Sequence, residues 1–256
     1  YAQNLRALQQ GEPAPAGHGL AAARLAHRVV ASLTLVLVIV MAMTTLATKP
    51  VLKRAGALSL ALLLLALGLA VLGIATPGAR LPAVAMGNLL GGFVMFALCW
   101  RLAASAKPQG AAAGLGLWAI AGLALLCAQL AGGALVSACY AALSCGDLAD
   151  CTRAAAAAGW DWSLLNPWRE PVVEATALPV NAASAFALWL HRVGAVVVLP
   201  VLALLGLAAW RRGRRRGGAA LLLLAALQGA LGLLIVATGL PLAAVLAHNL
   251  IAALLL

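Results

Sequence analysis

The chain has 256 residues, of which 65% are hydrophobic and only 9% charged. This composition excludes a soluble globular domain, in which about half of the residues are apolar and about a quarter are charged. The apolar residues also arrive in runs of about 20, the length at which a helix crosses a bilayer core of about 30 Å. The sequence therefore predicts an all-α integral membrane protein.

Seven apolar runs predict seven membrane helices, in chain order about Leu25–Ala47, Ala55–Ala75, Leu81–Ala104, Gly114–Ala138, Ala183–Trp210, Ala219–Thr238 and Pro241–Leu256. A polar stretch, Tyr1–Gly19, precedes the first run and is predicted to be a loop, because it has no apolar core of its own. The last run stops in mid-span. We therefore expect an eight-helix parent protein, seven helices of which are visible in this chain.

The charges predict how the helices are oriented. Basic residues gather in the connections after the first, third and fifth helices: Lys49, Lys53, Arg54, Arg101, Lys107 and the arginine run at 211–216. The positive-inside rule makes these connections cytoplasmic, and all six acidic residues fall on the other side. We expect a multi-pass protein of the bacterial inner (plasma) membrane. The arginine run is interpreted as a topology anchor beside membrane lipid, so no nucleic-acid partner is expected.

Two sets of motifs recur along the chain and predict an internal repeat. The matching segments are Ala26-His27-Arg28-Val29 with Leu190-His191-Arg192-Val193, and Leu81-Pro82 to Gly87-Asn88-Leu89 with Leu240-Pro241 to His248-Asn249-Leu250. An even number of helices per unit keeps both copies in the same orientation. We predict two tandem four-helix bundles in parallel, residues 1–108 without their leading helix and residues 109–256, the latter with an extracytoplasmic loop at 139–182.

The predicted helices place His191 and His248 at the same depth below the extracytoplasmic surface. Each lies roughly eight residues into its helix, about 12 Å at 1.5 Å per residue. Two such imidazoles can approach one iron from opposite faces of a flat macrocycle. Arg192, beside the first of them, can pair with a heme propionate.

Other interpretations of these histidines are a helix-to-helix hydrogen bond, a zinc site and a proton relay. Zinc is disfavoured because no acidic or thiol ligand accompanies the histidines at that depth. A relay normally needs carboxylates within the membrane, and the predicted spans have none. A helix-to-helix hydrogen bond is the usual role of a single histidine in a membrane helix, but two histidines at matched depth in corresponding repeat positions favour a heme. We therefore predict that His191 and His248 are the ligands of a heme iron.

The long extracytoplasmic loop holds a short cysteine pair. Cys145 and Cys151 are close enough in sequence to close a disulfide on an oxidising side of the membrane, with a metal pair as the weaker alternative. Cys99 and Cys127 lie within apolar helices and are expected to be packing residues. The loop also carries Trp160, Trp162 and Trp168, which predict an interfacial lid over the cofactor pocket.

Taken together, these motifs resemble the heme A synthase family, whose members convert heme O to heme A by oxidising a ring methyl to a formyl group. The resemblance covers nearly the whole chain. It rests on the two His-Arg pairs, on Leu240-Pro241 through His248-Asn249, and on Gly132-Gly133-Ala134-Leu135-Val136-Ser137 running into the cysteine loop.

The resemblance implies a role for each half of the chain. The carboxyl-terminal unit of the family holds heme b between two histidines, which correspond to His191 and His248. The amino-terminal unit is catalytic and holds the substrate heme, with a second histidine pair. His27 matches the first of that pair, and Arg24 and Arg28 would hold propionates.

Two expected residues of the amino-terminal site are different here. The second histidine of the pair falls at Gly87 or Asn88, and the family's glutamate, one turn before the first histidine, is replaced by Arg24. Met86 and Asn88 are the candidates for the other face of that iron.

The resemblance implies a heme A synthase for cytochrome oxidase biogenesis, with heme b for electron transfer and heme O or heme A as substrate or product. The alternative is a catalytically altered, heme-b-binding assembly or electron-transfer subunit of a respiratory complex. A transporter built on the same repeat would normally show broken helices or midplane charges. The expected partners are a heme O donor enzyme and cytochrome oxidase assembly components.

Overall fold

The computed structural model describes residues 18–48, 53–76, 81–105, 116–171 and 181–256, and all of its regular structure is helical. Each of the seven predicted membrane helices is present: α2 (His18–Ala47), α3 (Lys53–Ala75), α4 (Pro82–Ser105), α5 (Gly116–Ala138), α7 (Ala185–Arg211), α8 (Arg215–Ala237) and α9 (Leu242–Leu255). The prediction of an all-α fold is confirmed. The loop predicted at the start of the chain lies, up to residue 17, outside the described residues.

Two helices begin earlier than the apolar runs indicated. α2 begins at His18 rather than Leu25, because the alanines before Arg24 favour a helix although they add little to an apolar run. α8 begins at Arg215 rather than Ala219. The break before it is Gly213, whose φ of 85° lies in the left-handed region that glycine adopts at little cost.

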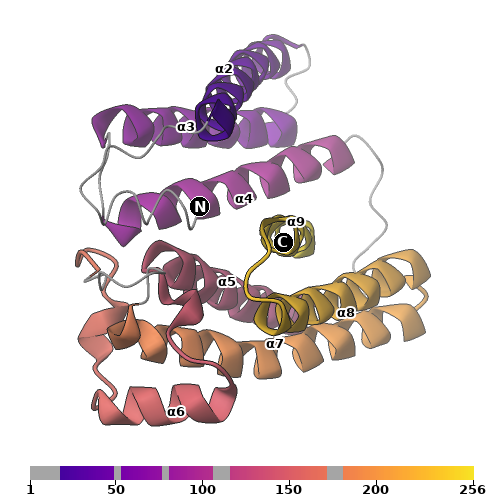
Figure 1. Ribbon diagram of the computed structural model, residues 1–256. Helices are drawn as coiled ribbons and strands as arrows, with labels where there is room; N and C mark the ends of the chain where they lie inside the picture. The colour runs from indigo at the N-terminus through magenta and orange to yellow at the C-terminus, as the bar shows by residue number, and fades with distance from the viewer. Residues whose placement is uncertain (1–17, 49–52, 77–80, 106–115, 172–180) are drawn as a thin grey trace. The chain divides into compact units, whose positions relative to one another are not determined.

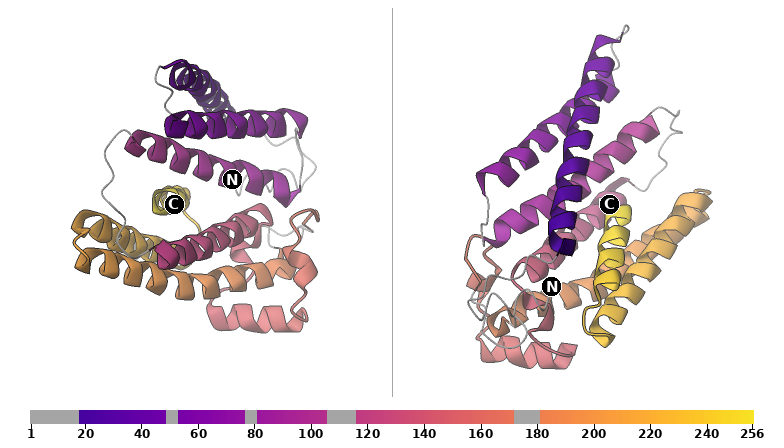
Figure 2. Two further views of the ribbon diagram at one scale, coloured as in Figure 1. Left: turned by 180° about the vertical axis from the view of Figure 1, so that it is seen from behind. Right: turned by 45° about the horizontal axis from the view of Figure 1, so that its top comes forward.

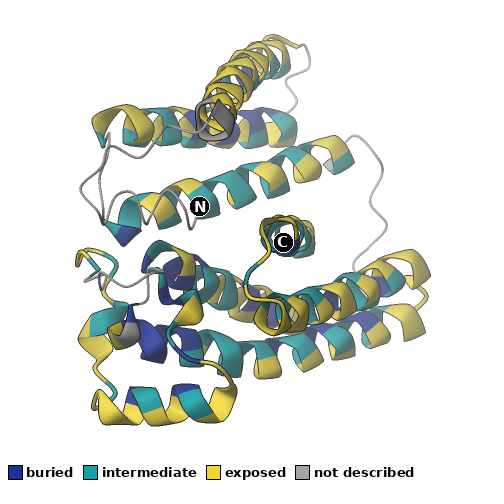
Figure 3. Cartoon of the chain, in the orientation of Figure 1, coloured by how far each residue is buried: buried dark blue, intermediate teal, exposed yellow. Residues whose placement is uncertain are grey.

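Among the described residues, six helices are long and apolar enough to cross a membrane, and α9 is a shorter apolar helix. Their large apolar side chains are widely exposed, as Figure 3 shows along α2 and α3. Ile74 is 80% exposed and Leu117 79%. Apolar surface on this scale needs lipid rather than water around it. The chain is therefore a multi-pass membrane protein.

The chain divides into two compact units. The first holds α2, α3 and the end of α4, within Tyr1–Ala79, Leu98–Gln109 and Val173–Val180; the second comprises Arg80–Ala97, Gly110–Val172 and Asn181–Leu256. In the first unit α2 packs against α3. A Cβ added at Gly56 would lie 3.1 Å from a methyl group of Leu46, so the two helices approach closely there. The predicted repeat boundary at residue 108 stays a prediction.

In the second unit, α7 packs against both α5 and α8, and α8 packs against α9 (Figures 1 and 2). The hairpin of α7 and α8 is tight because glycines face each other: a Cβ at Gly218 would lie 2.6 Å from the backbone oxygen of Gly206. Such close backbone approach is the usual role of small residues between membrane helices. The arrangement leaves α8 as the shared neighbour of α7 and α9.

The loop after α5 contains a helix that the sequence analysis missed, α6 (Leu148–Ala157). Asp147 caps it, since its carboxylate accepts a 2.7 Å hydrogen bond from the backbone N–H of Asp150. α6 packs against α7, where Trp189 Nε1 donates a 3.0 Å hydrogen bond to Thr152 Oγ1. The sequence analysis overlooked this helix because it is too short, and its first residues are too polar, to resemble a membrane span.

The tryptophans of the predicted lid take different positions. The Trp160 ring packs edge-on against Phe186, with 5.6 Å between ring centroids, and also against Trp189 at 4.9 Å. Trp162 also packs edge-on against Phe186, at 5.1 Å, but it is 69% exposed, and Trp168 is 71% exposed. Exposed indoles at the end of a helical bundle are typical of the membrane–water interface. Whether the segment covers a cofactor pocket stays a prediction.

Candidate functional site

The two histidines of the second unit occupy equivalent positions in their helices. His191 is six residues after the start of α7 at Ala185, and His248 is six residues after the start of α9 at Leu242. At 1.5 Å per residue, each lies about 9 Å into its helix. Both histidines thus hold the same position relative to the starts of their helices, six residues in rather than the predicted eight, and their equal depth below the membrane surface stays a prediction.

Each imidazole is bound by a glutamine from a neighbouring helix. On α5, Gln129 Nε2 lies 3.0 Å from Nδ1 of His191 and donates a 2.8 Å hydrogen bond to the backbone oxygen of the same residue. On α8, Gln228 Nε2 lies 3.0 Å from Nε2 of His248. Polar side chains at membrane depth are costly unless they are paired, so these contacts account for the presence of both glutamines.

The hydrogen bonds leave one nitrogen of each imidazole available. The described hydrogen bonds of His191 do not use its Nε2. In His248 the buried Nδ1 has no partner, and the Oε1 of Gln228 is likewise buried and unpartnered. Because a buried polar atom without a partner is unfavourable, these atoms are candidates for binding a further group.

Glycines make the room that the His191 ring occupies. A Cβ at Gly133 on α5 would lie 2.9 Å from Cε1 of His191, so even an alanine there would displace the ring. A Cβ at Gly194 on α7 would overlap the Gln129 amide oxygen, so that amide fills the space above this glycine. The ring and the amide therefore occupy spaces that a side chain at either of these glycines would fill.

His191 on α7 and His248 on α9 both belong to the second unit. Their helices share few direct contacts, since α8 is the neighbour that packs on both. The structure thus places the two imidazoles in one compact unit without packing α7 tightly against α9. That they face a macrocycle from opposite sides stays a prediction.

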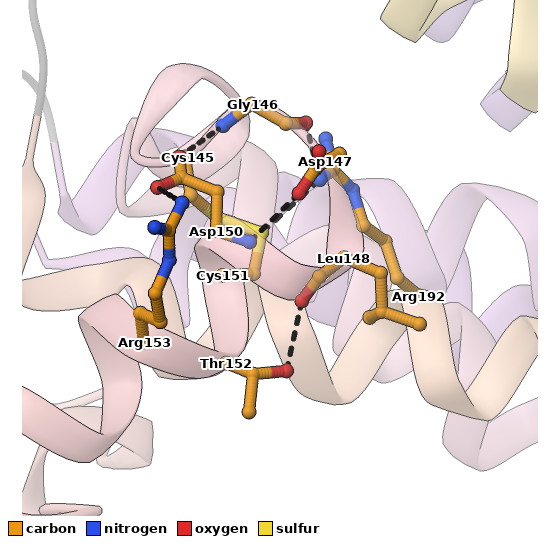
Figure 4. Close-up of polar contacts among 9 residues, drawn as sticks. All are labelled: Cys145, Gly146, Asp147, Leu148, Asp150, Cys151, Thr152, Arg153 and Arg192. Carbon is orange, nitrogen blue, oxygen red and sulfur yellow. Dashed lines mark hydrogen bonds and ion pairs between the residues drawn. A yellow bond between two sulfur atoms is a disulfide. The ribbon is translucent and has the colours of Figure 1, made fainter.

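Arg192, the residue after His191, binds the loop that carries α6 (Figure 4). Its Nη1 donates a 2.6 Å hydrogen bond to the backbone oxygen of Gly146 and lies 3.1 Å from Sγ of Cys151. Cys151 forms a disulfide with Cys145, as predicted. The described contacts of Arg192 are therefore with protein, and its pairing with a heme propionate stays a prediction.

The residues predicted for the amino-terminal site are divided between the two units. Arg24, His27 and Arg28 lie on exposed positions of α2 in the first unit. In the second unit, Met86 packs against the apolar cluster beside the disulfide, and Asn88 is exposed on α4. Their roles at a substrate heme stay predictions.

The donor set of the second unit fits a heme better than a simple metal ion. Within the described ranges, no cluster of three or more histidine, cysteine, aspartate or glutamate side chains could hold a metal. A bis-histidine heme needs only two protein ligands, each offering one nitrogen of a neutral imidazole. The described hydrogen bonds leave Nε2 of His191 and Nδ1 of His248 unused, so the pair offers the two nitrogens that this requirement names.

A separate cavity of about 250 Å³ lies among α5, α7, α8 and α9, and is lined by Ala119, Gly122, Leu123, Leu126, Leu202, Leu205, Ala209, Leu221 and Leu255. All of these residues are apolar. Binding sites usually combine an apolar lining with a few well-placed polar groups, which this cavity does not have. The polar chemistry of the unit is concentrated at the histidines instead.

The fold and the histidine–glutamine pairs describe a helical membrane protein with a polar site inside the bundle. The chain belongs to the COX15-CtaA family of cytochrome oxidase assembly proteins, the heme A synthase family, whose model matches residues 21–256. Searches of curated proteins and of solved structures gave no match. The resemblance inferred from the sequence is confirmed at the level of the family, and with it a role in cytochrome oxidase assembly.

The sequence analysis missed the two glutamines. Both lie nine residues before the end of their helix, at Ala138 and Ala237, and both are followed four residues later by a glycine, Gly133 or Gly232. An amide inside an apolar run marks a polar contact in the membrane. That signal, repeated in the same spacing on α5 and α8, would have identified them.

Proposed function

We propose that the chain is a heme A synthase, which oxidises a ring methyl of heme O to a formyl group and so supplies heme A for cytochrome oxidase biogenesis. The observation that carries the proposal is the matched pair His191 and His248, equally deep in α7 and α9 and each bound by a glutamine. Membership of the family supports the reaction class, an oxidoreductase acting on heme.

In this proposal His191 and His248 hold heme b. When bound, heme b supplies one-electron transfer from an external donor. The chain itself keeps the imidazoles apart and oriented, and it surrounds them with apolar helices. Arg192 ties the ligand-bearing turn of α7 to the disulfide loop through Gly146 and Cys151.

His27 is the residue proposed to position the substrate heme, with Arg24 and Arg28 binding its propionates by charge-assisted hydrogen bonds. Met86 and Asn88 are the candidates near the other face of that heme. Heme O or heme A is the substrate or product of this unit. The proposed partners are membrane lipid, a heme O donor enzyme and cytochrome oxidase assembly components.

We further propose that the protein lies in the bacterial inner membrane with the histidines and the cysteine loop on the extracytoplasmic side. The basic residues between α7 and α8, at the opposite end of α7 from His191, support this orientation. The disulfide in the loop is consistent with an oxidising compartment.

A second function is favoured by one specific observation. The position three before His27 is Arg24, and residues 87 and 88 are glycine and asparagine, so the amino-terminal site does not have the glutamate and the second histidine that the resemblance implies. A chain altered in this way could serve as a heme-b-binding assembly or electron-transfer subunit of a respiratory complex. The two functions differ in whether heme A is made.

The heme b assignment is tested on the purified protein by absorption spectroscopy and pyridine hemochrome analysis. His191→Ala and His248→Ala should each abolish the low-spin heme b spectrum, because one axial ligand is lost. His27→Ala, on α2, is the matched control and should keep it. A low-spin spectrum that survives in both α7 and α9 variants would refute the assignment.

Catalysis is tested by supplying heme O, oxygen and a reductant to the heme-b-loaded protein. Appearance of heme A or its hydroxylated intermediate, lost in His27→Ala, supports the synthase. A spectrally intact protein that is reduced by the donor and yields neither product would favour the assembly or electron-transfer subunit.

A further inference from the structure

The hydrogen bond between Gln129 and His191 joins residues 62 positions apart, on two different membrane helices. The same amide nitrogen also donates to the backbone oxygen of His191, so Gln129 is fixed to α7 by two contacts. A contact of the ring alone would leave the amide free to swing. The double contact instead holds the amide against both the ring and the backbone of α7.

The amide of Gln129 has a prepared place on α7. Gly194 is the residue one turn beyond His191, and a Cβ there would overlap the amide oxygen. On α5, Gly133 is one turn beyond Gln129 and leaves room for Cε1 of the His191 ring. Each helix thus contributes one polar group and the gap into which the other helix's polar group fits.

The same spacing occurs a second time. Gln228 is followed after one turn by Gly232, and a Cβ at Gly232 would lie 3.5 Å from Cε1 of His248. Gln228 also bonds to the ring of its histidine, but it contacts Nε2 of His248, whereas Gln129 contacts Nδ1 and the backbone oxygen of His191. Two independent copies of glutamine, glycine and partner histidine argue against a chance contact between polar side chains.

We propose that Gln129 is a positioning residue for His191: its amide, lodged at Gly194, binds Nδ1 of the imidazole and turns Nε2 towards the heme. This inference rests on the proposed function, because it assigns His191 as a ligand. Hydrogen bonds to the far nitrogen of a ligating histidine fix the ring orientation and raise the basicity of the ligand.

The chemistry of an amide suits this role in both states of the site. As described, Gln129 donates to Nδ1, so the proton of the neutral ring lies on Nε2. Ligation of iron through Nε2 would place that proton on Nδ1. The amide of Gln129 would then rotate, exchanging its two described contacts for one in which its oxygen accepts the Nδ1 proton, because an amide carries a donor and an acceptor at its two ends.

The test compares Gln129→Leu with Gln129→Glu in the heme-b-loaded full chain. Leucine keeps the bulk but accepts no hydrogen bond, so the midpoint potential of the heme should shift upward as the ligand becomes less basic. Glutamate keeps the side-chain length and an acceptor oxygen, so the midpoint potential in Gln129→Glu should equal the wild-type value or lie below it. General disruption of the bundle would not give this difference between the two variants.

A second readout reports the ring orientation directly. The electron paramagnetic resonance g values of a low-spin ferric heme depend on the angle between its two imidazole planes. They should change in Gln129→Leu and in Gly194→Ala, whose added methyl displaces the amide without altering the glutamine. Cys127→Ala, an exposed position two residues before Gln129, is the matched control and should change neither the g values nor the potential.

Each outcome has a defined meaning. If wild-type protein holds a bis-histidine heme and Gln129→Leu leaves both potential and g values unchanged, the positioning role is overturned while the proposed function stands. If the low-spin heme persists in both His191→Ala and His248→Ala, the proposed function itself fails. Should a folded Gln129→Leu chain bind no added heme while Gln129→Glu binds it, the positioning role is supported.

Discussion

The guanidinium Nη1 of Arg192 lies 3.1 Å from Sγ of Cys151, one half of the disulfide in the outer loop. Its neighbour in sequence, His191, is bound in another direction, to Gln129 on α5. Two consecutive residues of α7 therefore attach the same helical turn to the bundle interior and to the extramembrane loop. Changes in the loop are expected to reach the proposed heme ligand through this single turn.

Removing the disulfide should destabilise the loop. A link between Cys145 and Cys151 closes a short loop of chain, for which loop-closure entropy gives about 2 kcal/mol of stabilisation. Cys151→Ser, or addition of a reductant, should therefore lower the thermal unfolding midpoint measured by differential scanning fluorimetry. Cys127→Ser removes an exposed cysteine outside the disulfide and should not change it. An equal fall of the unfolding midpoint in Cys151→Ser and Cys127→Ser would contradict the prediction.

Replacing Arg192 by lysine should loosen the loop without removing the charge. The guanidinium bonds to Gly146 and contacts Cys151 from one nitrogen, a geometry that the shorter reach and compact head of lysine do not reproduce. The loop should lose about 1–2 kcal/mol of stability. The backbone amides of Gly146 and Asp150 should therefore exchange hydrogen faster. Hydrogen-exchange mass spectrometry of residues 145–157 measures this. Unchanged exchange in Arg192→Lys would show that the bonds carry no stability.

The neighbouring glycines 132 and 133 provide a test of ring placement. A Cβ at Gly133 would lie 2.9 Å from Cε1 of His191, whereas one at Gly132 would lie 3.7 Å from Nδ1, an ordinary contact. Gly133→Ala should force the ring aside, which should lower the free energy of unfolding by about 1–3 kcal/mol and weaken the proposed binding of heme b roughly tenfold. Gly132→Ala should bind as wild type. Titration of each variant apoprotein with heme measures its heme affinity. Equal heme affinities of Gly133→Ala and Gly132→Ala would show that the methyl group added at Gly133 does not displace the His191 ring.

Cys139 should be unreactive in the folded protein. Burial raises the pKa of its thiol to about 11, so the reactive thiolate is scarce at neutral pH. Alkylation by iodoacetamide should be slow from pH 7 to 9 and should accelerate only towards pH 11. Because the unfolded thiol ionises near pH 9.0, its ionisation also favours unfolding between pH 9.0 and about 11. Mass spectrometry measures the rate; rapid labelling at pH 8 would contradict the prediction.

The sequence by itself determined the helices and their membrane character. Hydropathy and helix length are local properties, so the runs ending at Ala75 and Ala138 could be bounded correctly without any knowledge of packing. It also determined the family, because the His-Arg pairs and the cysteine loop keep their order along the chain. The short helix α6 was missed, since a membrane-span search does not detect a brief amphipathic helix in a loop.

Only the tertiary structure decided which side chains meet. Lipid is as apolar as the bundle interior, so the faces of α5 and α7 carry no amphipathic pattern that would predict their contact. Gln129 and His191 are 62 positions apart, and only the packing of those two helices brings the amide to the imidazole. The same packing gives Arg192 a partner in the disulfide loop, because side-chain contacts between helices depend on rotation and depth, which a linear sequence of apolar residues does not specify.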